Sequence, residues 1–134
     1  MTQRIFDMVY HSIVGGGLSS GICGSARQCA IAHRLYYYVR TFYDAKDSPY
    51  THGTIVAVGM IAQFAYNGSE KEAEMFAERL RRLSMPASMK ELGVRHGGEA
   101  LKECVDYMMT QEEMVLAGKD KQVRLEHALS YIFR

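Results

Sequence analysis

The chain has 134 residues, 48% of them hydrophobic, which is enough for one compact domain with its own apolar core. Its 16 lysines and arginines nearly balance 15 aspartates and glutamates, so its charge gives no reason to expect binding to nucleic acid or to an anionic membrane. The longest apolar run, residues 54–66, is too short to cross a bilayer, and the first residues lack a signal-peptide pattern. Three cysteines without a CxxC pair favour reduced thiols, so we expect a cytoplasmic protein.

Helical periodicity dominates the first half of the chain. Apolar residues spaced three and four apart predict helices over about residues 2–14, 25–43 and 51–66. The glycine-rich stretch 15–24 separates the first two, and a polar turn containing Pro49 separates the second and third. The third segment is apolar on almost every side, which predicts a helix buried in the middle of a bundle.

The second half repeats one helix-start signal. Ser69, Ser88 and Thr110 are each followed three residues later by glutamate, which is the spacing of a capping box. The first box predicts a helix that ends before Pro86, and the second predicts a short helix ending at Gly93. Two further helices are expected nearer the C-terminus, over about residues 98–109 and 120–133.

We therefore predict an all-α fold, a single helical bundle over residues 1–134 without an internal repeat or linker. The first three helical segments are very apolar for a small free-standing domain, and the chain also carries nine methionines and nine tyrosines. Such a surface favours cover by another chain or by a second copy, so we expect a homo-oligomer or a complex.

His33 and His52 are the residues that point most directly to chemistry. A short turn makes consecutive helices antiparallel neighbours, so imidazoles near their facing parts can converge on one point. Imidazole is the commonest protein ligand for zinc and also suits iron. By residue type alone, however, a hydrogen-bonded core histidine and a helix-start histidine are the more usual interpretation. No third ligand follows at a helical offset, and Asp44 and Asp47 in the turn are possible but not required by spacing.

Other patterns are weaker. The glycine stretch 15–24 has bare amides that suit a phosphate, but it has no Walker lysine and no preceding strand, so we interpret it as a helix-breaking loop. The triple Tyr36-Tyr37-Tyr38 is typical of packing. Cys29, one turn before His33, is either half of a thiol–imidazole pair or a small buried residue. No residue is assigned a catalytic role on these grounds.

Two segments carry a family resemblance: AIAHRLYYYVRTF (30–42) and SPYTHGTIVAVGMIAQF (48–64). They resemble the C-terminal helical domain of the iron-containing alcohol dehydrogenase superfamily, most closely its glycerol dehydrogenase branch. The likeness runs from about Leu18 to the end and includes Thr51-His52-Gly53 and the stretch MPASMKELGV (85–94). It implies the helical bundle of dehydroquinate synthase-like and iron-containing alcohol dehydrogenases.

In that family two histidines at these places bind a catalytic zinc or iron together with an aspartate from an earlier helix. The resemblance thus implies that His33 and His52 are metal ligands. In that family the metal polarises the substrate hydroxyl while hydride passes to a nicotinamide cofactor, so the resemblance implies the same chemistry for the parent enzyme. The resemblance also implies that a loop near the substrate contains Gly16, Gly17, Ser20 and Gly21.

The chain departs from the family by what it lacks. It carries neither a dinucleotide-binding domain nor the helix of the aspartate ligand, so it looks like roughly the last third of such an enzyme. We expect an incomplete Zn²⁺ or Fe²⁺ site, and NAD only through a missing domain or a complementary chain. One hypothesis is a C-terminal fragment of a glycerol dehydrogenase-like, NAD- and metal-dependent alcohol or polyol oxidoreductase, inactive alone. The other is a non-catalytic all-α homo-oligomer that kept the fold.

Overall fold

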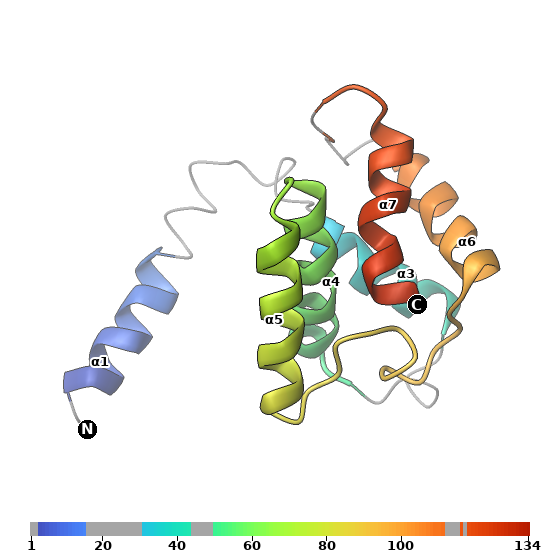
Figure 1. Cartoon of the computed structure of the whole chain (residues 1–134). Coiled ribbons are helices and arrows are strands. Elements are labelled where there is room, and N and C mark those ends of the chain that lie inside the picture. Colours follow the sequence, from blue (N-terminus) through green and yellow to red (C-terminus); the bar gives the residue numbers. More distant parts are fainter. Residues whose placement is uncertain (1–2, 16–30, 44–49, 112–115, 117) are drawn as a thin grey trace.

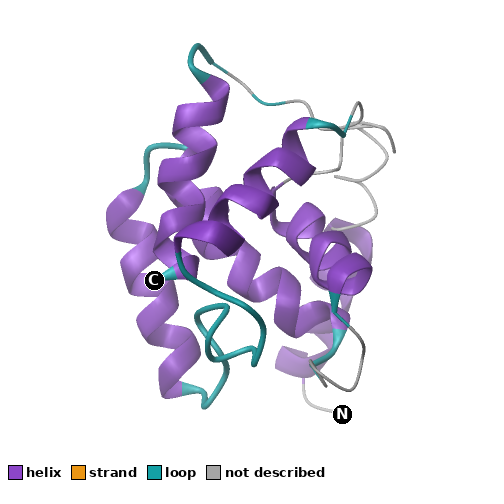
Figure 2. Cartoon of the chain, turned by 90° about the vertical axis from the view of Figure 1, so that its right-hand side faces the viewer, coloured by secondary structure: helices purple, strands orange, loops and turns teal. Residues whose placement is uncertain are grey.

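The computed structural model describes residues 3–15, 31–43, 50–111, 116 and 118–134. Within these ranges every regular element is a helix, which confirms the predicted all-α fold (Figures 1 and 2). None of these described helices is long and apolar enough to cross a membrane. In chain order they are α1 (Gln3–Tyr10) continued by the π-helical turn η1 (His11–Gly15), α3 (Ile31–Phe42), α4 (His52–Tyr66), α5 (Glu70–Arg82), α6 (Gly98–Met109) and α7 (Lys121–Phe133).

Helix α4 is the centre of the bundle. It packs against α3, α5 and α7, and α6 completes the bundle by packing on α3 and α7. Figure 1 shows α4 between α5 on one side and α3 and α7 on the other. Ile55, Val58 and Ala62 of α4 are fully buried, as expected for a helix that is apolar nearly all round. The prediction of a central buried helix over 51–66 is therefore confirmed.

The contact between α3 and α4 is unusually close. A Cβ added at Gly59 would lie 2.6 Å from the Cα and 2.8 Å from the carbonyl oxygen of Ala32, so the two backbones touch. One helical turn further along α4, Gln63 accepts a hydrogen bond through Oε1 from the backbone N–H of Ile31 (3.0 Å). This bond satisfies one of the unpaired N–H groups at the start of α3 as the structure describes it.

Residues 83–97 connect α5 to α6, and this connection contacts the end of α7. The Met89 N–H donates to the carbonyl of Ile132 (2.8 Å) and the Gly97 N–H to that of Phe133 (2.9 Å). These are among the last carbonyls of α7, which have no partner inside their own helix. The side chains of Met89 and Leu92 are fully buried in the core.

The short helix predicted for residues 88–93 is wrong, because this segment forms hydrogen-bonded turns. Its capping-box side chains nevertheless form bonds: the Glu91 N–H donates to Ser88 Oγ (3.2 Å), and the Ala87 N–H donates to Glu91 Oε2 (2.8 Å). The Met89 N–H bonds to α7 instead of to a helix of its own, and Gly93 has φ +74°. Tertiary contacts therefore override the local start signal.

The other two capping boxes fare differently. Ser69 does precede α5, but its side chain makes no cap hydrogen bond, so the predicted box there is wrong. Its backbone, at φ −107° and ψ 59°, lies outside the extended conformation that a capping residue normally adopts. Thr110 ends α6 and donates through Oγ1 to the carbonyl of Tyr107 (2.8 Å), and Glu113 lies outside the described residues.

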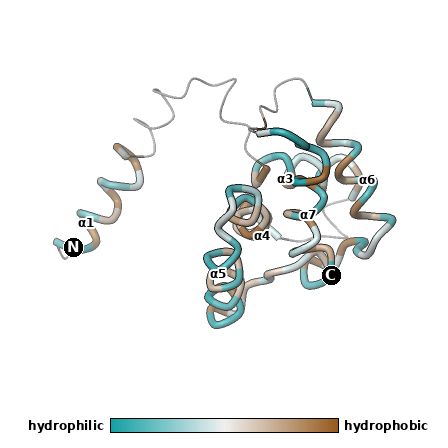
Figure 3. Tube along the Cα trace, turned by 45° about the horizontal axis from the view of Figure 1, so that its top comes forward, coloured by the Kyte–Doolittle hydropathy of each residue, from teal (hydrophilic) through white to brown (hydrophobic). Residues whose placement is uncertain are grey.

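Helix α1 lies apart from the bundle. Among the described elements it contacts only η1, which continues it, and Figures 1 and 3 show it separated from the other helices. Apolar side chains of α1 and η1 face solvent, with Met8 of α1 64% exposed and Ile13 of η1 68% exposed. The described bundle therefore consists of α3 to α7, and a single domain over residues 1–134 stays a prediction.

The close approach at Gly59 is testable by substitution. We expect Gly59→Ala to lower the free energy of unfolding by about 3 kcal/mol, because the new Cβ must push the α3 backbone away. Gly53→Ala, in the same helix, is the matched control, since nothing lies within 4 Å of a Cβ there. There the higher helix propensity of alanine makes the change neutral or stabilising by about 0.5 kcal/mol. Urea unfolding followed by far-UV circular dichroism measures both, and equal stabilities would refute the backbone contact.

Candidate metal centre

Helices α3 and α4 bring His33 and His52 together at the surface of the bundle. Their ring centroids lie 5.5 Å apart, with the ring planes inclined by 59°. Both residues are exposed, so the space beside the rings is open to solvent. The predicted convergence of the two imidazoles is confirmed, and their role as metal ligands remains a prediction.

The separation of the two rings suits one shared metal ion. Zinc–nitrogen bonds are about 2.0–2.1 Å long and tetrahedral ligand angles are about 109°, so two imidazoles on one zinc have ring centroids about 5 Å apart. The observed 5.5 Å is close to that separation. The distance between the two rings is therefore compatible with one divalent metal ion bound by both imidazoles.

The local backbone explains why both rings are available. His52 is the first residue of α4, after Thr51 in an extended conformation (φ −71°, ψ 165°), so it lies at a helix start and not in the buried middle. His33 follows Ala32, the residue that touches Gly59, and it is exposed while its helical neighbours Arg34 and Leu35 are buried. The core interpretation of His33 is thus wrong, since α3 directs its buried face elsewhere.

The protonation equilibrium of His33 favours the form that binds metal. Partial removal of water around its ring lowers its pKa, and the nearby imidazole of His52 lowers it further. Both effects disfavour the charged imidazolium. Metal binding requires the neutral ring, so His33 is prepared for it near neutral pH.

Tyr36 joins the two histidines, which sequence reasoning missed because all three tyrosines were assigned to packing. Its ring centroid lies 4.4 Å from that of His52, edge to face at 65°. Tyr38 is fully buried in the core and Tyr37 is exposed, so the triplet divides into three different environments. The available signal was spacing: Tyr36 follows His33 by three residues and so shares its helix face.

Arg40 lies beyond Tyr36 on the same face of α3. Its guanidinium carbon is 5.8 Å from the Tyr36 ring centroid, and Nη2 donates a hydrogen bond to the carbonyl of Tyr50, just before α4. His33, Tyr36 and Arg40 follow a spacing of three and four residues, which aligns them along one stripe. This stripe borders the start of α4.

The described part of the chain does not complete a conventional site. Among its residues no group of three or more His, Cys, Asp or Glu side chains gathers to hold a metal. The other candidates from the sequence lie outside the described residues: Gly16, Gly17, Ser20, Gly21, Cys29, Asp44 and Asp47. Within the described part of the chain, the candidate site thus consists of two exposed histidine side chains.

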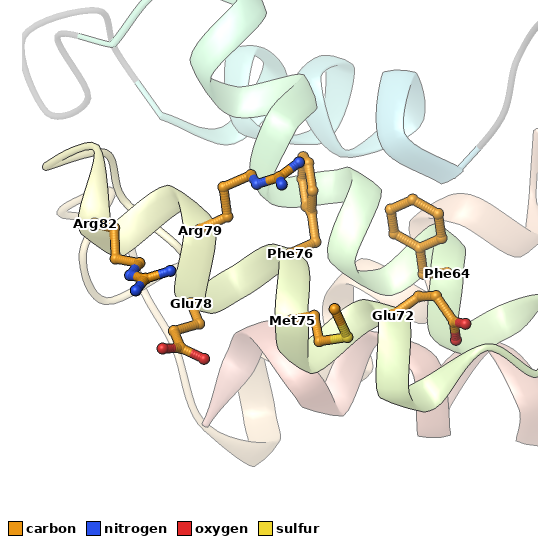
Figure 4. A pocket seen from close by; sticks show the side chains of 7 residues that line it. All are labelled: Phe64, Glu72, Met75, Phe76, Glu78, Arg79 and Arg82. Carbon is orange, nitrogen blue, oxygen red and sulfur yellow. The ribbon is translucent and has the colours of Figure 1, made fainter.

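A separate groove of about 300 Å³ lies between α4 and α5 (Figure 4). It contains no histidine or cysteine, and Phe64 at its edge is three helical turns along α4 from His52. Its walls combine apolar and oppositely charged side chains: Phe64, Glu72, Met75, Phe76, Glu78, Arg79 and Arg82. Nothing there provides a nucleophile or a metal ligand set beyond the two glutamates.

Comparison with known proteins gives one informative likeness. No family model matches the chain, and no solved structure matches it significantly. The chain is similar to hydroxycarboxylate dehydrogenase A of Escherichia coli (strain K12), with 27% identity over 100 residues. The match covers 75% of this chain and 27% of that protein, so the chain spans about a quarter of the length of the relative. This similarity supports a link to dehydrogenases and an oxidoreductase-like origin. It does not support the glycerol dehydrogenase branch in particular.

Metal binding by the histidine pair is directly measurable. We expect the purified chain to bind about one zinc ion, and His33→Ala or His52→Ala to weaken binding by about 100-fold, since even outer partners of a metal are worth about 10- to 100-fold. His127→Ala is the control, because that histidine pairs with Glu70 on α5 (Nε2 to Oε1 3.0 Å) and not with the site. Equilibrium dialysis gives both affinity and stoichiometry. Equal zinc binding by all four proteins would exclude the pair as the site.

Proposed function

We propose that this chain is the metal-binding portion of a dehydrogenase that oxidises a hydroxyl group, with His33 and His52 as two ligands of its metal. The observation that carries this proposal is the 5.5 Å separation of two exposed imidazoles from neighbouring helices. The similarity to a dehydrogenase supports it independently of the geometry.

The role of the chain's own residues follows from their position. The imidazoles of His33 and His52 would hold the metal, and their exposure would leave the solvent side of the site free for a substrate oxygen. When bound, the metal supplies Lewis-acid stabilisation of the negative charge that develops on the substrate oxygen. A nicotinamide cofactor, bound by a separate domain or chain, would accept the hydride.

The name of the similar protein indicates a hydroxycarboxylate as the first substrate class to test. A small alcohol or polyol, as used by the glycerol dehydrogenase branch, is the alternative. Substrates of both classes carry a second oxygen near the reacting hydroxyl. The exposed pair of histidines leaves room for two oxygen donors from a substrate.

Complementation tests this function. We expect the chain alone to oxidise no hydroxycarboxylate or polyol with NAD, because the described residues form only helices and no dinucleotide-binding sheet. Mixed with zinc or iron and with a form of the Escherichia coli relative that lacks the matched region, the chain should restore NADH formation, measured by absorbance. His52→Ala should fail to restore it, and His127→Ala should behave as the parent chain does. Restoration by His52→Ala would contradict the ligand role.

A second function, a non-catalytic homo-oligomer, is favoured by a different observation. Several apolar side chains of α1 and η1, among them Met8 and Ile13, are exposed, and no helix of the described bundle packs against these two elements. An isolated amphipathic helix of this length is marginal in water, so it gains stability from a partner surface. In this alternative the helical fold serves assembly, and the histidine pair has no role in chemistry.

Light scattering distinguishes this alternative. We expect a dimer or larger assembly that Met8→Glu with Ile13→Glu converts to monomer, because two charges would have to be buried in the interface. Val123→Glu is the matched control, since Val123 on α7 is 67% exposed and lies outside α1. A parent chain that is monomeric at high concentration would exclude the oligomer.

A further inference from the structure

We propose that the phenol oxygen of Tyr36 is the third protein donor to the metal held by His33 and His52, and that the resulting site prefers ferric iron to zinc. The inference rests on the proposed function, because it requires the two histidines to bind a metal.

Position carries the first step. Tyr36 lies three residues after His33 on α3, so the two side chains are neighbours on the helix surface. Between α3 and α4, the centroids of the Tyr36 and His52 rings lie 4.4 Å apart, which is closer than the 5.5 Å between the centroids of the two imidazoles. Tyr36 therefore belongs to the same cluster of rings as the two histidines.

The surroundings of Tyr36 limit its freedom. Its ring is partly buried and packs against the hydrophobic core, so ordering it around a metal loses less side-chain entropy than ordering a free surface residue. The Arg40 guanidinium lies 5.8 Å from the ring centroid and donates a hydrogen bond to the Tyr50 carbonyl. This contact is a second restraint on the position of the Tyr36 ring.

The donor set also needs an anionic member. Among the described residues no third His, Cys, Asp or Glu joins the histidine pair. Two neutral imidazoles leave the charge of a metal uncompensated, and a phenolate oxygen supplies the missing negative charge. Tyrosine oxygen is a hard donor known to bind iron in proteins, which is why we infer ferric iron.

The test uses absorption, because phenolate bound to ferric iron gives a charge-transfer band in visible light. The parent chain, Tyr36→Phe and the control Tyr37→Phe are each titrated with ferric citrate, and iron per chain and the visible spectrum are recorded. Tyr37 is the matched control because it is the next residue, exposed, and near Arg34 instead of His52. We expect the band in the parent and in Tyr37→Phe. In Tyr36→Phe we expect no band and iron binding weaker by about tenfold.

A second variant keeps the inference testable if Tyr36→Phe disturbs the fold. Tyr36→His replaces the phenol by an imidazole donor, so it should retain iron or zinc but show no phenolate band. Far-UV circular dichroism checks that each variant keeps the helical content of the parent chain.

The remaining outcomes separate the inference from the function beneath it. Two results overturn the role of Tyr36 and leave the histidine pair as the proposed metal site. One is stoichiometric ferric iron in the parent chain without the band, and the other is a band that survives in Tyr36→Phe. A band lost equally in Tyr37→Phe also overturns it. A parent chain that binds neither iron nor zinc overturns both the inference and the proposed function.

Discussion

The structure depends on one contact, the approach of the α4 backbone at Gly59 to the α3 backbone at Ala32. Only a residue without a side chain permits it. This contact lets α4 occupy the centre, with α3, α5 and α7 around it. It also sets the distance between the two helices that carry the histidines. A larger separation of α3 and α4 would move the His33 ring away from His52. The contact between Gly59 and Ala32 therefore determines both the packing of the core and the distance between the two histidines at the surface.

In the proposed metal site, both histidine side chains are exposed to solvent. Exposed imidazoles suit metal capture, whereas transfer of hydride is favoured when water is kept away from the reacting atoms. The relative is far longer than this chain, and the matched region covers 27% of it. The open side of the pair is therefore where we expect the rest of an active site, contributed by further protein, to lie. The exposed apolar face of α1 is a second surface that additional protein would cover.

Hydrogen bonds from the connection between α5 and α6, residues 83–97, stabilise the end of α7. Two backbone N–H groups of that connection, from Met89 and Gly97, satisfy carbonyls at the end of α7. Their partners, Ile132 and Phe133, are the last buried residues of the chain. The core and the C-terminus are thus tied together by backbone bonds as well as by burial, which makes the last helix part of the same cooperative unit as α4.

The sequence by itself determined the elements whose signals are local. Periodicity predicts α4, α6 and α7 to within about one residue at each end, because a helix with one buried face shows a regular spacing of apolar residues in its sequence. It also singled out His33 and His52. Only the tertiary structure decided that residues 88–93 form turns, because the Met89 N–H bonds to Ile132, 43 residues away (132 − 89). It likewise decided that Tyr36 lies against His52 while Tyr38 is buried, since three consecutive tyrosines have the same local pattern and differ only in what the neighbouring helices place beside them.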